Sequence, residues 1–225
     1  EGAVRPGQRL LDLGTGTGSL ARGFARMGLE VTGLDVRETM LDEARHIDRQ
    51  AGVIVRYLRA PAEASGLAGE SFDVVSAGQC WHWFDRPRVA AEVHRLLVPD
   101  GRVLIAHFDW IPLAGNVVEA SERLIRAHNP GWTLHGGTGL HPAWLADLAL
   151  AGFKDLETFS FDLDVPYRHD AWRGRIRASA GVGASLDEAA VRRFDDEHGA
   201  MLADRFPDEP LAVPHRCWAV HGRKA

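Results

Sequence analysis

The amino-acid sequence predicts an α/β protein built on a doubly wound, mainly parallel sheet of seven strands. Strand and helix patterns alternate along residues 9–108, which is the order of a parallel sheet with helices on both faces. A glycine-rich loop at residues 14–18 joins the first strand to the first helix. Two later segments, 159–165 and 216–221, alternate apolar and polar residues, which is typical of an antiparallel edge on such a sheet.

The first half of the chain carries five strand patterns and three helix patterns. Apolar or β-branched runs predict strands at 9–13, 29–34, 53–58, 72–77 and 102–108. Apolar residues at helical spacing predict helices at 19–27, 38–51 and 86–97. Gly28 and Gly52 follow the first two helices and can adopt the left-handed conformation that ends a helix. The Pro-Asp-Gly sequence at 99–101 predicts a turn before the fifth strand.

The second half is mostly helical in pattern. Helices are expected at 116–128, 142–150, 171–179 and 186–205, with a glycine-rich loop at 129–141. A minimal doubly wound sheet has no place for these helices. We therefore interpret them as a helical insertion that covers the ligand site like a lid.

Composition and charge exclude several classes of protein. With 45% apolar and 25% charged residues, the 225-residue chain is globular and folds without disulfides. Its net charge of −5 and the lack of a basic stripe argue against nucleic-acid binding. No apolar run reaches the ~20 residues of a membrane span and no signal peptide is visible, so we expect a cytoplasmic protein without membrane contact. Neither the two cysteines nor the eleven histidines show metal-ligand spacing, so we predict no metal site.

The motif that carries chemistry is Leu-Asp-Leu-Gly-Thr-Gly-Thr-Gly at residues 11–18. Glycines between a strand and a helix let the backbone approach a ligand closely. The spacing is G-x-G-x-G, whereas dinucleotide sites usually carry G-x-G-x-x-G. Asp12 precedes the first glycine, where a carboxylate would repel a pyrophosphate and favour a ligand with positive charge.

Asp35 adds a second requirement on the ligand. It ends the next predicted strand, where a carboxylate can accept hydrogen bonds from both hydroxyls of a ribose. A ligand that combines an adenosine with cationic groups and no phosphate is S-adenosylmethionine, which carries a sulfonium and an ammonium. We therefore expect S-adenosyl-L-methionine as the cofactor, with S-adenosyl-L-homocysteine as its product.

At these residues the chain resembles the class I S-adenosylmethionine-dependent methyltransferases, and among them the type 11 group of mostly small-molecule enzymes. The matching segments are the glycine motif, Gly-Leu-Asp at 33–35, Ala62-Glu63, Ser-Phe-Asp-Val-Val at 71–75, Gln-Cys-Trp-His-Trp-Phe-Asp at 79–85 and Leu-Leu-Val-Pro-Asp-Gly at 96–101. The resemblance covers residues 8–110 well and the remainder loosely. It implies a Rossmann-like fold and methyl transfer to a small-molecule acceptor by in-line displacement.

The resemblance also implies how the chain is organised. Residues 1–225 would form a single methyltransferase domain. Within it, residues 1–110 would be the cofactor-binding half, 111–210 a helical lid and acceptor region with one strand, and 211–225 the last strand. The oligomeric state is left open.

Cofactor contacts follow from the resemblance residue by residue. The predicted cofactor-binding set is Asp12, Gly14, Thr15, Gly16, Gly18, Asp35, Val36, Ala62, Glu63, Gln79 and Trp83. The glycine loop and Asp12 would line the methionine end, Asp35 the ribose and Val36 the adenine. Ala62 would present its backbone N–H to the adenine, and either Glu63 or a water would replace an acidic residue that the family often has at the position of Pro61. Gln79 would lie near the methionine carboxylate or sulfonium. Trp83 would either face the cation or pack onto the sheet.

Two histidines are catalytic candidates: His82 as a general base, and His107, which together with Asp109 would face the acceptor. His82 follows the fourth predicted strand and His107 ends the fifth, where ligands of such sheets bind. His82 could equally orient the cofactor or hold its own loop. A base is needed only when the acceptor must lose a proton, because the sulfonium is already an activated methyl donor. Three arginines, Arg173, Arg175 and Arg177, are either a solvated face or a site for an acidic acceptor.

Other functions fit the sequence less well. A short-chain NAD(P)-dependent oxidoreductase would carry Tyr-x-x-x-Lys, but the residues four positions after Tyr57 and Tyr167 are Pro61 and Ala171. A methyltransferase for exocyclic amines of nucleic-acid bases would carry Asp/Asn-Pro-Pro-aromatic after the fourth strand, where this chain has Ala-Gly-Gln-Cys at 77–80. A protein that binds S-adenosylmethionine without catalysis stays open as an alternative.

Overall fold

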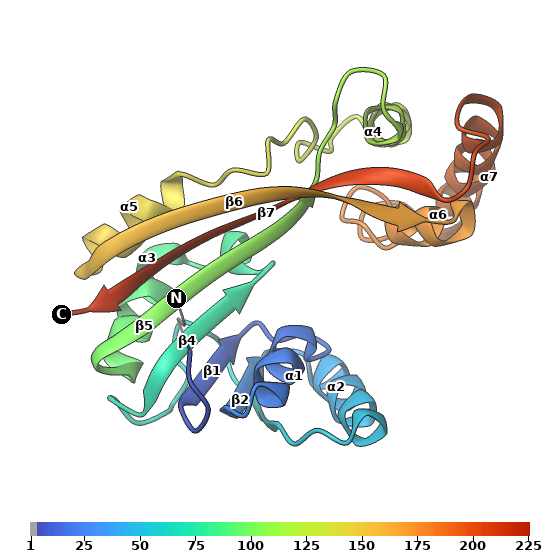
Figure 1. Cartoon of the computed structure of the whole chain (residues 1–225). Coiled ribbons are helices and arrows are strands. Elements are labelled where there is room, and N and C mark those ends of the chain that lie inside the picture. Colours follow the sequence, from blue (N-terminus) through green and yellow to red (C-terminus); the bar gives the residue numbers. More distant parts are fainter. Residues whose placement is uncertain (1–3) are drawn as a thin grey trace. The chain divides into compact units, whose positions relative to one another are not determined.

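The computed structural model describes residues 4–225, and the elements alternate as the sequence predicts (Figure 1). The strands are β1 (Arg9–Leu13), β2 (Glu30–Asp35), β3 (Arg56–Arg59), β4 (Phe72–Gly78), β5 (Leu97–Trp110), β6 (Phe153–Tyr167) and β7 (Leu211–Lys224). The helices are α1 (Ser19–Arg26), α2 (Glu38–Ala51), α3 (Arg86–Leu96), α4 (Val117–His128), α5 (Ala143–Leu150), α6 (His169–Arg177) and α7 (Glu188–Arg205). A short 3-10 helix, η1 (Trp81–Trp83), follows β4.

All seven strands form one sheet, in the order β3-β2-β1-β4-β5-β7-β6. β1 pairs in parallel with β2 and β4, while β2 pairs with β3 and β4 with β5 in the same sense. β7 runs antiparallel to β5 and β6, as the arrows in Figure 1 show. The predicted α/β fold, with its mainly parallel seven-stranded sheet and antiparallel C-terminal edge, is therefore confirmed.

The chain divides into two compact units. The first consists of Glu1–His107, His141–Phe159 and Trp218–Ala225, and the second of Phe108–Leu140 and Ser160–Cys217. Strands β5, β6 and β7 contribute residues to both units. The organisation of residues 1–225 as one domain with a lid at 111–210 stays a prediction.

In the first unit the two faces of the sheet carry separate apolar cores. Leu10 of β1 packs with Ala21 of α1 on one face. Leu11 and Leu13 point to the other face, where they pack with α3 and α5 residues such as Leu148. Alternate residues of a strand point to opposite faces, so a strand that is covered by helices on both sides needs an unbroken apolar run. This is why the sequence of β1 reads as a run rather than as an alternation.

The second unit has its own core, where α4 and α6 each pack on α7. His198 of α7 is fully buried there, with Nε2 3.0 Å from the hydroxyl oxygen of Ser121. The same oxygen accepts a bond from Trp172 Nε1 at 3.0 Å, and its own proton is donated to the carbonyl of Val117 at 2.8 Å. A serine hydroxyl has one proton, so Nε2 of His198 must donate the bond to Ser121. The other ring nitrogen, Nδ1, is buried without a hydrogen-bond partner in the structure.

Several strands differ in extent from the sequence expectation, and β7 spans 211–224 rather than 216–221. β3 begins at Arg56 rather than at 53, and β6 begins at Phe153 rather than at 159. β6 is the edge strand, and its alternating residues Phe161 and Leu163 are exposed rather than half-buried, because alternation does not guarantee burial at an edge with one neighbour. The turn predicted at 99–101 lies inside β5, where the pairing with β4 shifts register. Within residues 4–225, no helix is both long and apolar enough to span a bilayer.

Candidate cofactor site and histidine cluster

The glycine loop lies where the sequence predicts it, between the end of β1 and the start of α1. Gly16 has φ +55°, in the left-handed region, and a Cβ added there would meet no atom within 4 Å. Gly18 also has positive φ, but a Cβ there would lie 2.2 Å from the hydroxyl of Tyr57. Gly18 is therefore required by packing beneath the loop, whereas the open side of Gly16 leaves room for a ligand against the backbone.

Asp35 reaches the glycine loop directly. One carboxylate oxygen accepts a 2.9 Å hydrogen bond from the backbone N–H of Gly16, and the other accepts a 2.9 Å bond from the N–H of Arg37. The side chain is largely buried at the end of β2. Each carboxylate oxygen has a further lone pair, so two neighbouring hydroxyls of a ribose can still donate to it.

Asp12 is a second buried carboxylate beside the loop, only 2% exposed. It accepts hydrogen bonds from the hydroxyls of Thr15 and Ser76, each at 2.7 Å. Burial raises the pKa of the Asp12 carboxyl to about 6, against the opposing effect of these two hydroxyls. At neutral pH Asp12 is thus mainly ionised, and its field favours a cation near the loop. Its bonds also fix Thr15, another residue of the predicted set.

A buried ion pair holds the loop from below, and sequence patterns gave no signal for it. Arg22 of α1 pairs with Asp48 of α2, and both side chains are almost fully buried. Arg22 also donates to the carbonyl of Thr17 in the glycine loop at 3.0 Å. Tyr57 donates to Asp48 at 2.7 Å and at the same time contacts Gly18. In the sequence, each of these residues looks like an ordinary surface or strand residue. Their contacts cannot be seen there, because Asp48 and Tyr57 lie 26 or more positions from Arg22 along the chain.

The loop after β3 carries the predicted adenine contacts. Ala62 is buried, whereas the side chain of Val36 is exposed. Glu63 accepts a 3.0 Å hydrogen bond from the backbone N–H of Asp85, so it connects this loop to the segment before α3. The structure therefore gives Glu63 a role in holding the loop. Its predicted contact with adenine stays a prediction.

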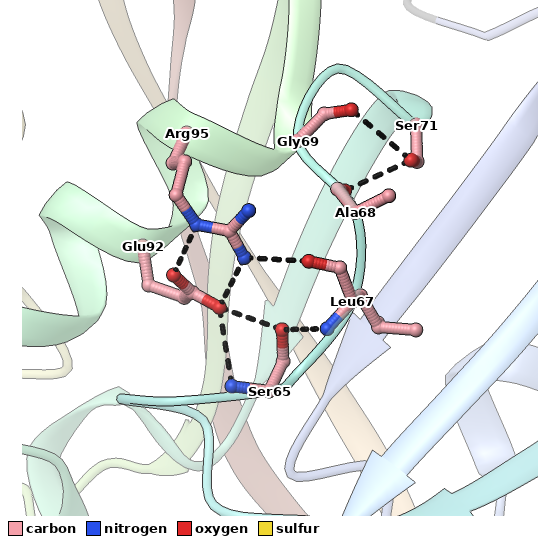
Figure 2. Close-up of polar contacts among 7 residues, drawn as sticks. All are labelled: Ser65, Leu67, Ala68, Gly69, Ser71, Glu92 and Arg95. Atoms are coloured by element: carbon pink, nitrogen blue, oxygen red, sulfur yellow. Dashed lines mark hydrogen bonds and ion pairs between the residues drawn. The ribbon is translucent and has the colours of Figure 1, made fainter.

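The same loop is fastened to α3 further along, as Figure 2 shows. Glu92 accepts bonds from the backbone N–H and the hydroxyl of Ser65, at 3.1 and 2.6 Å. Arg95 donates to Glu92 at 2.8 Å and also to the carbonyl of Leu67 at 2.8 Å. The Arg95 guanidinium, helped by Ser65, lowers the pKa of the Glu92 carboxyl to about 2. This network fixes the course of the loop that follows Ala62.

The segment after β4 brings Gln79 and Trp83 to the same end of the sheet. Gln79 is an exposed residue with φ +60°, and its backbone N–H donates to the carbonyl of Ala106 at 3.0 Å. Trp83 is 67% exposed, whereas Trp81 in the same short helix is fully buried and donates to Asp147 at 3.1 Å. Trp81 therefore packs the segment onto the sheet, and the exposed ring of Trp83 stays available for a ligand.

Both catalytic candidates, His82 and His107, belong to one cluster of aromatic rings in the first unit. Nδ1 of His82 lies 3.1 Å from Nε2 of His107. His107 is buried, and its ring also lies 4.5 Å, centroid to centroid, from the ring of His141. His141 stacks on Trp144 at 4.1 Å. His141 stands at the end of a glycine-rich segment, and nothing in the sequence indicated that it would join the two predicted histidines.

These features agree with comparisons to known proteins. Residues 11–105 match a family model described as a methyltransferase domain. Over 111 residues the chain is 36% identical to the ubiquinone/menaquinone biosynthesis C-methyltransferase of Vibrio vulnificus, which covers 47% of this chain and 43% of that protein. The chain thus spans less than half the length of this curated relative.

Two solved structures share the fold over nearly the whole chain. One is the Haemonchus contortus phosphoethanolamine N-methyltransferase 2 in complex with phosphomonomethylethanolamine and S-adenosylhomocysteine, with a TM-score of 0.59, 22% identity, and coverage of 99% of this chain and 50% of that one. The other is the [4+2]-cyclase SpnF, with a TM-score of 0.59, 20% identity, and coverage of 98% and 76%. At these identities the likeness shows the fold alone. The match across residues 11–105, which contain the glycine motif, Asp35 and His82, shows that this part of the chain is similar to methyltransferase domains.

Proposed function

We propose that this chain transfers a methyl group from S-adenosylmethionine to a small-molecule acceptor. The observation that carries the proposal is the pair of buried carboxylates, Asp12 and Asp35, on either side of a glycine loop that is open at Gly16. Two negative charges beside the loop disfavour a pyrophosphate and favour a nucleoside with cationic groups. The similarity of residues 11–105 to a methyltransferase-domain model supports the same cofactor.

Different residues of the first unit would hold different parts of this cofactor. Asp35 accepts the ribose hydroxyls, and the backbone beside Gly16 lies against the methionine end. The buried carboxylate of Asp12 stabilises the cationic groups through its field. Gln79 and Trp83 bound the same end of the site, where an aromatic face stabilises a cation by about 0.5–2 kcal/mol. When bound, S-adenosylmethionine supplies an activated methyl group on a sulfonium.

His82 and His107 are the proposed proton-handling groups. A histidine ring that donates through Nδ1 keeps its lone pair on Nε2. If His82 Nδ1–H donates to His107 Nε2, then Nε2 of His82 is the atom that accepts a proton from the acceptor. The buried ring of His107 holds that tautomer and orientation, so it acts as a positioning residue. An acceptor that attacks through an atom without a proton needs neither role.

The test is formation of S-adenosylhomocysteine from S-adenosylmethionine with a panel of small hydroxyl, amine, thiol and activated carbon acceptors. We expect S-adenosylhomocysteine to form with at least one acceptor class, and its formation to stop when that acceptor is left out. His82→Gln should lower kcat by about 100-fold for a hydroxyl acceptor and leave the affinity for S-adenosylhomocysteine unchanged. Tight cofactor binding without turnover of any class would instead support the alternative of a binding protein, or of a reaction other than methyl transfer on this fold.

A further inference from the structure

A cavity of about 640 Å³ lies in the first unit, at the edge of the sheet opposite the predicted cofactor site. The first residues of four parallel strands line it: Arg9 of β1, Glu30 of β2, Arg56 of β3 and Phe72 of β4. The glycine loop and Asp35 stand at the other ends of β1 and β2. Parallel strands begin at one edge of a sheet and end at the other, so this cavity is separate from the cofactor site.

The cavity forms where the chain crosses from β3 to β4. Residues 60–71 make this connection without a helix, whereas α1, α2 and α3 make the connections between the other parallel strands of this unit. Leu67 and Phe72 pack in the apolar core on the face of Leu11 and Leu13. A loop covers less of a sheet than a helix does, so the starts of the strands stay open to solvent at this place, where Arg9, Glu30 and Arg56 are exposed.

The loop that forms one wall of the cavity is held in place by polar contacts. Figure 2 shows how Glu92 and Arg95 of α3 bind it at Ser65 and Leu67. Further along, the hydroxyl of Ser71 donates to the carbonyl of Ala68 at 2.8 Å. The backbone N–H of Ser71 also donates to the carbonyl of Leu96 at 2.9 Å. This wall is therefore formed before any ligand binds, as is usual for small-molecule sites.

The charged residues of the cavity differ in their partners. The backbone N–H of Arg9 donates to Asp73 at 2.8 Å, and its guanidinium pairs with the same carboxylate at 3.4 Å, so the charge of Arg9 is neutralised. Within residues 4–225, neither Arg56 nor Glu30 forms an ion pair or a side-chain hydrogen bond, with each other or with any other residue. The cavity therefore presents one cation and one anion that lack partners.

The sheet holds these two charges apart. Arg56 is the register partner of Thr32, two residues beyond Glu30 on β2. The backbones of Glu30 and Arg56 are thus separated by one strand spacing of about 4.8 Å and by about 6.6 Å along the strands. An α-amino acid can bridge such a gap when its ammonium and its carboxylate each make one hydrogen bond. Beside the two charges the lining is apolar, and Ile54 exposes 92% of its surface there.

We propose that this cavity binds an apolar α-amino acid. Its carboxylate pairs with Arg56, its ammonium pairs with Glu30, and its side chain lies against Leu67, Phe72 and Ile54. A ligand with a single charge would pair with one of the two residues and leave the other without a partner, whereas a zwitterion pairs with both. Contact with the apolar side chain would also remove part of the exposed surface of Ile54 from water. This site is additional to the proposed methyl transfer and does not rest on it.

The test uses the full chain and three probes: L-phenylalanine, 3-phenylpropanoate, which lacks the ammonium, and 2-phenylethylamine, which lacks the carboxylate. Affinities are measured by calorimetry with and without excess S-adenosylhomocysteine, because the cofactor also carries an α-amino acid and its site has to be filled. We expect phenylalanine to bind about tenfold tighter than either analogue in both conditions. In NMR spectra it should shift the amide signals of Glu30 and Arg56 and leave that of Gly16 unchanged.

Variants assign each charge to its residue. Glu30→Gln should remove the preference for phenylalanine over 3-phenylpropanoate, because the ammonium has lost its partner. Arg56→Gln should remove the preference over 2-phenylethylamine for the corresponding reason. Glu43→Gln and Arg49→Gln are the matched controls, since they remove the same charges from exposed positions of α2 outside the cavity. Both controls should keep both preferences.

Three results would overturn the proposal: no binding of phenylalanine at millimolar concentration, equal binding of phenylalanine and either analogue, or displacement of phenylalanine by S-adenosylhomocysteine. Displacement would show that the amino acid occupies the cofactor site instead. Failure of the chain to bind S-adenosylhomocysteine overturns the proposed function alone, whatever phenylalanine does at Glu30 and Arg56.

Discussion

The backbone N–H of Gly16 donates a 2.9 Å hydrogen bond to the carboxylate of Asp35, which joins the glycine loop to the end of β2. The two residues stand 19 positions apart in sequence and belong to neighbouring parallel strands and their loops. Carboxyl ends of adjacent parallel strands meet at one edge of the sheet, which is where ligands of such sheets bind. This bond shows that the two predicted halves of the nucleoside site come together in the folded chain.

Asp35→Ala should weaken binding of S-adenosylhomocysteine by about 1.5–3 kcal/mol, the usual loss for hydrogen bonds to a charged group. The affinity is measured by calorimetry. Asp42→Ala is the matched control, because Asp42 is an exposed acid of α2 that pairs with Arg45. Equal affinities of wild type and Asp35→Ala would remove Asp35 from the ribose site.

The ion pair beneath the glycine loop gives a second prediction. Asp48→Asn leaves the buried charge of Arg22 without its partner, so the free energy of unfolding should fall by about 3–5 kcal/mol. The double variant Arg22→Met, Asp48→Leu replaces the pair with apolar side chains and should recover most of this stability. It should still bind the cofactor more weakly, because the carbonyl of Thr17 has lost its donor.

Chemical denaturation and calorimetry on the two variants decide between a structural and a positioning role. Recovered stability with weakened cofactor binding supports positioning of the loop by Arg22. Full recovery of cofactor affinity in the double variant would mean that the pair stabilises the fold and does nothing for the site.

Much of this site was readable from the sequence, because its parts are local. The glycine motif, Asp12 and Asp35 each stand at the end of a strand pattern, and the ends of parallel strands meet by rule. The pairing of Arg22 with Asp48, the packing of Tyr57 against Gly18 and the approach of His141 to His107 were not readable. They depend on contacts between distant segments, which residue spacing along the chain does not encode.

The buried His198 makes stability depend on pH. Burial lowers its pKa from 6.5 to about 4, so the unfolded chain binds a proton at this residue that the folded chain does not. The contribution of neutral His198 to the free energy of unfolding is fully present above pH 6.5. It is lost as the pH falls toward 4, by about 3 kcal/mol in total. Asp12 has the opposite effect on stability below about pH 6. Its pKa is raised in the folded chain, so its protonation favours the folded state as the pH falls.

The contribution of His198 to stability is therefore measured as the difference in free energy of unfolding between the wild type and a variant at this position. His198→Gln keeps a donor toward Ser121 but has no group that titrates in this range. Free energies of unfolding for both proteins are compared at pH 7 and pH 5. The gap between wild type and variant should narrow at the lower pH, and a constant gap would show that His198 gains its proton equally in both states.

The hydrogen bonds of Glu92 in Figure 2 predict that stability also depends on pH in a second, more acidic range. The folded pKa of Glu92 is lowered to about 2 from 4.5, so its contribution is present above pH 4.5 and is lost only as the pH falls toward 2. Glu92→Gln should destabilise the protein by about 1–3 kcal/mol at pH 7, because the charge-assisted bonds to Arg95 and Ser65 are weakened. Glu188→Gln, which breaks an exposed pair with Arg192, should cost less than about 1 kcal/mol. Similar losses for the two variants in denaturant titrations would contradict the assignment.

The most direct measurement is calorimetric titration of the purified chain with S-adenosylhomocysteine and, separately, with NADH. Two carboxylates beside an open glycine loop should accept a nucleoside without phosphates and repel a dinucleotide. We predict saturable binding of one S-adenosylhomocysteine per chain and no heat of binding with NADH. Binding of NADH at equal or higher affinity, or no binding of S-adenosylhomocysteine, would contradict it.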